Sequence, residues 1–229
     1  MKEVNDEQEQ LIYFALADCT GHGVPGALLS VMGMNALDEL IDAGIRQPAA
    51  LLNELRALVS RRLNTHEDKR NDGMDMALIL LNKQTNTVTF SGALLPMWIL
   101  RKDELIECHG QRMPIGYTFF DVSTFCEQTV QLFPDDKLIL FTDGIVDQFG
   151  GLNQKKFGRK MLREWLLKAT EESTPHLFSK LVHHFECWKG KEEQTDDCTI
   201  LVLEPHFAIN PVHEKHAVDQ MELIRVSSK

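Results

Sequence analysis

Hydrophobic positions along the chain fall into short continuous runs, which predict buried strands, and into longer segments with helical spacing. An apolar run of about four to eight residues, bounded by turn residues, is typical of a buried strand. Such runs occupy residues 11–17, 74–81, 95–100, 138–142 and 199–203, and Asp75 is an acid inside the second of them. Alternating polar and apolar residues predict two further strands, at 87–91 and 125–132.

Apolar residues near helical spacing predict four helices, which come as an early pair and a late pair. Their ranges are 27–43, 48–63, 157–168 and 175–188. Gly44 ends the first helix and Pro48 begins the second, and so short a connection favours antiparallel packing of the early pair. We expect the buried face of the early pair to include Leu28, Val31, Leu51, Leu55 and Leu58.

The order of these elements predicts the fold class. Strand signals follow one another through residues 74–142, without the regular helix between neighbours that a doubly wound parallel sheet needs. The pattern therefore favours an α+β fold, in which antiparallel sheet packs with helices.

Composition and charge narrow the classes of function. The 229 residues carry 24 Lys and Arg against 34 Asp and Glu, for a formal net charge of −10. This balance argues against general binding to nucleic acids or anionic membranes, which needs basic patches, and it is compatible with divalent cations where carboxylates converge. We find no apolar stretch of about 20 residues, no signal-peptide core and no Cys-x-x-Cys pair. We therefore expect a cytoplasmic protein with no membrane span in this segment.

Carboxylates stand at the ends of three of the predicted buried strands. Asp18 follows LIYFALA, Asp143 follows LILFT, and Asp196 and Asp197 precede TILVL. Hard cations such as Mg²⁺ and Mn²⁺ choose oxygen ligands and keep several waters, so a few aspartates suffice to bind them. Asp at a strand end is also a common turn or capping residue. The spacing alone leaves both interpretations open.

A glycine-rich loop follows Asp18 and precedes the first predicted helix. Gly21, Gly23 and Gly26 either cradle a phosphate at the helix start or form a tight turn that brings the helix against the sheet. His22 lies in this loop, where it is either a general acid for a leaving oxygen or a loop and capping residue.

Several motifs occur together in one order: ADCTGHGVPGALLS, GMDMALILLN, FSGALLPMWIL, LILFTDGIVDQFGG and TDDCTILVLE. In this order they resemble the SpoIIE-like branch of the metal-dependent type 2C protein phosphatases. The resemblance implies a phosphatase domain at 1–204, followed by a tail or short helix at 205–229. It also implies a two-sheet antiparallel β-sandwich flanked by helices and hydrolysis of phosphoserine or phosphothreonine on a protein.

The same resemblance implies a site with two Mn²⁺ or Mg²⁺ ions. Asp18 would bridge both metals, and the carbonyl of Cys19 would complete the shell of the second metal. Asp143 and Asp196 would bind the first metal.

Three more residues receive roles from the resemblance. Asp197 would support the ligands from a second layer. Asp147 matches an acid sometimes linked to a weak third metal, with a solvated loop acid as the alternative. His22 lies four residues after Asp18, two residues later than the histidine found in type 2C phosphatases.

The beginning of the sequence departs from the family pattern. A Gly-Asp-Phe-Tyr-like motif, whose Asp holds the second metal, should precede LIYFALA, and Asp6 and Glu7 do not match it. We therefore expect the chain to lack its N-terminal strand and to be weak or inactive as a phosphatase.

The resemblance also implies partners: a phosphorylated anti-sigma-factor antagonist or similar bacterial signalling protein as substrate, an upstream sensor or receiver domain, and a homodimer. Two other functions stay open at this point. One is a non-catalytic pseudophosphatase that docks a partner; the other is an ATP-binding, kinase-like domain.

Overall fold

The computed structural model describes residues 1–5, 10–21, 23–63, 72–116, 124–205 and 221–226. The chain divides into two compact units, which are described separately here. Unit 1 comprises residues 1–96 and 108–132, and unit 2 comprises residues 97–107 and 133–229. Each unit contains one main antiparallel sheet and its own helices, which confirms the predicted α+β class.

The sheet of unit 1 has the strand order β1-β2-β3-β4-β8, and β7 pairs with β3 beyond the end of β4. Its strands are β1 (Lys2–Asn5), β2 (Gln10–Cys19), β3 (Gly73–Asn82), β4 (Thr87–Ala93), β7 (Ile115–Gly116) and β8 (Gln128–Gln131). β2 and β3 form the longest pair, in register from Leu11 opposite Asn82 to Cys19 opposite Met74.

The first strand corrects one expectation. The sequence was expected to lack a strand before LIYFALA, yet Lys2–Asn5 forms β1 and pairs antiparallel with Gln10–Tyr13. The four residues alternate between half-buried and exposed positions, the two-residue period of a strand with one face covered.

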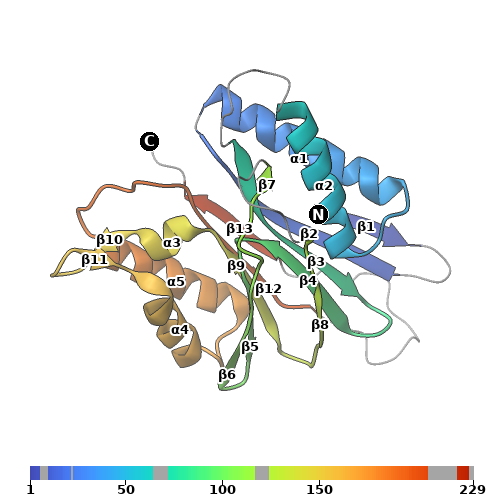
Figure 1. The fold of residues 1–229 in the computed structure, drawn as a ribbon. Coiled ribbons are helices and arrows are strands. Elements are labelled where there is room, and N and C mark those ends of the chain that lie inside the picture. The colour runs from blue at the N-terminus through green and yellow to red at the C-terminus, as the bar shows by residue number, and fades with distance from the viewer. Residues whose placement is uncertain (6–9, 22, 64–71, 117–123, 206–220, 227–229) are drawn as a thin grey trace. The chain divides into compact units, whose positions relative to one another are not determined.

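Helices α1 (Val24–Asp42) and α2 (Pro48–Leu63) lie along one face of this sheet (Figure 1). They cover the face that carries Leu11, Tyr13 and Leu78, and the Tyr13 hydroxyl donates to the carbonyl of Arg46 between the two helices at 3.0 Å. Leu51 and Leu55 are fully buried, as predicted.

The predicted buried face of α1 was wrong. The side chains of Leu28 and Val31 are 66% and 54% exposed, whereas Leu29 and Gly33 face the sheet. Apolar residues occur all around α1, so their spacing did not identify the packed side. α1 is also the described helix that is long and apolar enough to cross a membrane by length and composition alone, with 33% of that window buried.

The sheet of unit 2 has the order β13-β12-β9-β5-β6. Its strands are β5 (Met97–Arg101), β6 (Glu104–Cys108), β9 (Lys137–Phe141), β12 (Cys198–Leu203) and β13 (Met221–Val226). The unit also holds α3 (Asp143–Asp147), α4 (Gly158–Lys168), α5 (Thr174–Lys189) and a small hairpin of β10 (Phe149–Gly150) and β11 (Lys155–Lys156). Residues 221–226 were expected in a tail or short helix, but they pair with β12 along its whole length.

Candidate metal centre

The carboxylates of unit 2 lie where β9 ends and β12 begins. β9 leads through Thr142 into α3, a single short helix whose first and last residues are Asp143 and Asp147. Residues four apart lie on one face of a helix, so both acids occupy the same side of α3. Asp196 and Asp197 form the turn that enters β12.

A buried hydroxyl fixes this turn against α3. The Thr142 hydroxyl donates to the carbonyl of Asp197 at 3.0 Å and accepts from the backbone N–H of Thr199 at 3.0 Å. The Thr142 side chain is 2% exposed, so water is not available to replace either partner. The amide of Asp197 donates to the Asp196 carboxylate at 2.8 Å, which orients that side chain.

Gly144 permits the close approach of the two segments. A Cβ atom on Gly144 would lie 2.4 Å from the Asp197 carbonyl oxygen and 3.4 Å from the Cβ of Asp196. Any larger residue would therefore push the turn away from α3. The glycine of the Thr-Asp-Gly motif is required for space, since its φ is not in the left-handed region.

The electrostatics of Asp143 show that the acids of unit 2 are close enough to interact. Burial raises the pKa of Asp143, and the charges of Asp196 and Asp147 raise it further. Hydrogen bonds from the backbone N–H groups of Gly144 and Asp143 oppose this rise. We call Asp143, Asp147 and Asp196 the α3–β12 acid group. Their mutual repulsion is the condition that a bound cation relieves.

Asp147 has a second partner. Its carboxylate lies 2.9 Å from the ammonium of Lys156 on β11, and both side chains are about half exposed at 52%. An exposed pair of this kind contributes little to stability, and the lysine competes with a cation for the same oxygens. Asp147 is therefore a weaker ligand candidate than Asp143 or Asp196.

In unit 1, Asp18 lies near the end of β2 and is half-buried. Its partner across the sheet is another acid, Asp75 of β3. Residues directly opposite in an antiparallel pair point to the same side, with Cβ atoms about 4.5–5.5 Å apart. We call Asp18 and Asp75 the β2–β3 acid pair. Asp75 received no role from the sequence, although its position as an acid inside an apolar run was the available signal.

The remaining sequence-predicted residues stand as follows. Cys19 ends β2, and its thiol accepts from the Ser30 hydroxyl of α1 at 3.2 Å, while the proposed role of its carbonyl stays a prediction. His22 lies outside the described residues. The convergence of Asp18 with Asp143 and Asp196 also stays a prediction. The carbonyl and amide of Asp197 hold the turn, and its predicted role in supporting the metal ligands stays a prediction.

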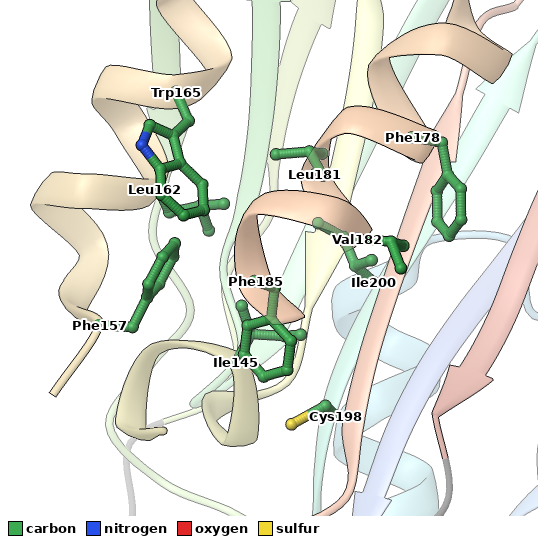
Figure 2. Close-up of a pocket in the computed structure, with 10 residues that line it drawn as sticks. All are labelled: Ile145, Phe157, Leu162, Trp165, Phe178, Leu181, Val182, Phe185, Cys198 and Ile200. Atoms are coloured by element: carbon green, nitrogen blue, oxygen red, sulfur yellow. The ribbon is translucent and has the colours of Figure 1, made fainter. Parts of the chain in front are cut away.

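A small apolar cavity lies among α3, α4, α5 and β12 of unit 2 (Figure 2). Its volume is about 30 Å³, and Ile145 of α3, Phe157, and Cys198 and Ile200 of β12 help to line it together with side chains of α4 and α5. Burial is the main cause that raises the pKa of the Cys198 thiol, to about 12, so this cysteine is not a reactive thiolate. Because the cavity is small and its lining is apolar, it is not a site for a phosphorylated side chain.

The donor set fits a hard divalent cation. The candidate ligands are carboxylate oxygens, with no imidazole or thiolate among them in the described residues. Such oxygens are the ligands of Mg²⁺ and Mn²⁺, which keep several waters and need few protein ligands. Among the described residues, no group of three or more His, Cys, Asp or Glu side chains lies close enough together to hold a metal ion by itself.

Comparison with known proteins adds the family. The model of the family described as stage II sporulation protein E (SpoIIE) matches residues 8–206. This chain belongs to the SpoIIE family. Its motifs at Asp18, Asp143 and Asp196 all lie inside the matched range.

Two similar proteins give the scale of the similarity. The phosphoserine phosphatase RsbU of Bacillus subtilis (strain 168) is 24% identical over 203 residues, which cover 86% of this chain and 56% of RsbU. The chain thus spans little more than half the length of that relative. The solved SiaA-PP2C domain of Pseudomonas aeruginosa is 29% identical, with a TM-score of 0.77, over 90% of this chain and 79% of that domain.

A second solved structure has the same fold and was determined with metal ions bound. The catalytic domain of the serine threonine protein phosphatase PstP in complex with 2 manganese ions superposes with a TM-score of 0.58 at 16% identity. It covers 88% of this chain and 94% of that domain, which shows a PP2C-like fold for this chain as well.

Proposed function

We propose that this protein is a metal-dependent phosphatase that hydrolyses phosphoserine or phosphothreonine on another protein. The observation that carries the proposal is the α3–β12 acid group, which a SpoIIE-family chain holds in place through Gly144 and the buried Thr142 hydroxyl. Membership in a family of metal-dependent Ser/Thr phosphatases supports the same conclusion.

In this proposal each acid has a role. Asp143 and Asp196 would hold one Mn²⁺ or Mg²⁺ ion. Asp18 would contribute its carboxylate to that ion and to a second one, and the carbonyl of Cys19 would be a further ligand of the second ion. Bound there, the ions supply Lewis-acid activation of water and neutralise charge on the phosphoryl group. Asp197 orients the turn, and Asp147 serves a weaker, third cation in exchange with Lys156. His22 is the proposed general acid for the leaving oxygen.

The name of one relative supports the proposed substrate class. RsbU is named as a phosphoserine phosphatase, and we propose that the present chain acts on a comparable phosphoprotein, an anti-sigma-factor antagonist in bacterial signalling. Such a role places the chain in the cytoplasm, under the control of a sensor or receiver domain. We also propose that the two sheets pack face to face as the β-sandwich of this fold, and that the domain forms homodimers.

The test is hydrolysis of a small phosphate ester and of a phosphoserine-bearing antagonist protein in millimolar Mn²⁺. We expect turnover that is weak, because no Gly-Asp-Phe-Tyr-like motif supplies its acid, and that requires Mn²⁺. It should fall by at least about 100-fold in Asp143→Asn, because losing a direct ligand costs at least as much as losing an outer partner, which costs about 10–100-fold. Asp103→Asn, an exposed acid in the turn between β5 and β6, is the matched control and should keep full activity.

Two results would contradict the proposal. One is turnover that Asp143→Asn and chelation leave unchanged. The other is tight binding of the phosphorylated antagonist with no hydrolysis at any Mn²⁺ concentration, which is the behaviour of a pseudophosphatase that only docks its partner.

A further inference from the structure

Asp75 stands opposite Asp18 in a part of the sheet where the register is firmly held. Two residues from Asp75 along β3, Gly73 accepts from the amide of Thr20 at 2.9 Å, and its own amide donates to the Thr20 hydroxyl at 2.8 Å. A Cβ on Gly73 would also lie 2.7 Å from the carbonyl of Ile115, so β7 closes against this end of β3. A slip of one residue would break these contacts, so the two carboxylates are fixed as neighbours.

The acid pair lies on a face of the sheet whose neighbouring side chains are apolar. Side chains alternate along a strand, so Asp18 shares its face with Phe14 and Leu16, and the opposite face packs under α1 and α2. Across the sheet, Phe14 meets Ile79 and Leu16 meets Ala77, and all four are buried. The acid pair is the polar end of this apolar stripe.

Two like charges directly opposite each other destabilise a sheet, and partial burial increases the repulsion. Both acids are half-buried. A divalent cation converts this repulsion into attraction, because each carboxylate then interacts with the ion more strongly than with its neighbour. A neutral residue in place of Asp75 would leave the ion with one carboxylate of this pair instead of two.

We propose that Asp75 supplies a second carboxylate to the divalent cation that Asp18 binds. This inference rests on the proposed function and deepens it, since it adds a protein ligand from unit 1 beside Asp18. It gives that ion two carboxylates held by adjacent strands, where the sequence motifs had supplied one carboxylate and a backbone carbonyl.

The experiment measures Mn²⁺ binding directly, by the electron paramagnetic resonance signal of free Mn²⁺ and by calorimetry, on the whole chain without substrate. The variants are Asp75→Asn, Asp143→Asn and, as a matched control, Asp72→Asn. Asp72 is a half-buried acid directly before β3, and it is not opposite Asp18. Thermal unfolding in the presence of a chelator gives a second readout that does not depend on metal.

We expect Asp75→Asn to weaken one class of Mn²⁺ site by about 10–100-fold while Asp72→Asn leaves both classes unchanged. We also expect metal-free Asp75→Asn to unfold cooperatively in the chelator, so that its weaker Mn²⁺ binding is not a consequence of a lost fold. A purely structural role would instead lower the metal-free unfolding temperature and leave the Mn²⁺ affinity as it was, and that result would overturn the inference.

The results for the different variants distinguish a failure of this inference from a failure of the proposed function. Mn²⁺ binding that needs Asp143 but is indifferent to Asp75→Asn refutes the role of Asp75 and leaves the proposed function standing. A parent chain that binds no Mn²⁺ and hydrolyses no phosphate ester refutes the proposed function itself, and the role of Asp75 with it.

Discussion

The two units hold their acids by different physical means. In unit 1, strand register places Asp18 opposite Asp75, and backbone hydrogen bonds all along β2 and β3 maintain that register. In unit 2, a short helix and a turn bring Asp143 near Asp196, and one close contact at Gly144 sets their separation. Many backbone hydrogen bonds together fix the positions of the acids in unit 1, whereas a few atoms at one contact fix the positions of the acids in unit 2.

A threonine hydroxyl is nevertheless found beside each acid group. Thr20 donates to the Gly73 carbonyl at 3.1 Å and accepts from the Gly73 amide at 2.8 Å, next to the β2–β3 acid pair. Thr142 joins Asp197 and Thr199 in the same way beside the α3–β12 acid group. Thr20 is exposed and Thr142 is buried, so the two hydroxyl groups should contribute different amounts to the free energy of unfolding.

The largest effect should come from Gly144→Ala. The added methyl would lie 2.4 Å from the Asp197 carbonyl oxygen, so the turn must shift and carry Asp196 with it. We expect a loss of about 1–3 kcal/mol in unfolding free energy, typical of overpacking, together with about 10–100-fold weaker Mn²⁺ binding. Calorimetry and chemical denaturation measure the two effects.

Gly158→Ala is the control for this substitution. Gly158 has a φ of +77° with open space around its Cβ position, so alanine there adds backbone strain without a clash. It should cost about 1–2 kcal/mol and leave Mn²⁺ binding intact. Equal Mn²⁺ binding by both variants would show that the close contact at Gly144 does not position the acids.

A smaller effect should separate Thr142→Val from Thr20→Val. Valine keeps the shape of threonine and removes the hydroxyl, which in Thr142 leaves two buried backbone groups without a partner. We expect about 1–3 kcal/mol of lost stability for Thr142→Val and no more than about 1 kcal/mol for Thr20→Val, where water replaces the hydroxyl. Denaturation midpoints measured in a chelator test this ranking, and equal losses would contradict it.

The sequence predicted the α+β class, the main strands and the ligand candidates of unit 2, because continuous apolar runs and strand-end acids are local signals. It did not predict that Leu28 and Val31 would be exposed, because α1 is apolar on several sides and only the sheet determines which side is packed. It also gave Asp75 no role, because the residue opposite Asp18 depends on a pairing between segments far apart in the chain. Strand β13 was missed for the same reason.

The smallest expected effect is on the pH dependence of stability in the absence of metal. It is seen by comparing the parent chain with Asp143→Asn. Asp143 is exposed by its surface area, but partial desolvation of its carboxyl group and the charges of Asp196 and Asp147 raise its pKa above the ordinary aspartate value of 3.8. Between these two pKa values the folded chain binds more protons at this group than the unfolded chain, so its stability falls as pH rises through that window. Above this window the loss of stability no longer changes with pH.

Asp143→Asn removes this loss of stability. In a chelator at pH 7 we therefore expect the variant to unfold at a slightly higher temperature than the parent. The gain in unfolding free energy should be well under about 1 kcal/mol, because the group is exposed and its charge is screened. The advantage should vanish near pH 3, where the parent carboxyl is protonated in both states, and Mn²⁺ at pH 7 should reverse the order. A variant less stable than the parent at pH 7 in chelator would show that the acids of unit 2 do not repel one another.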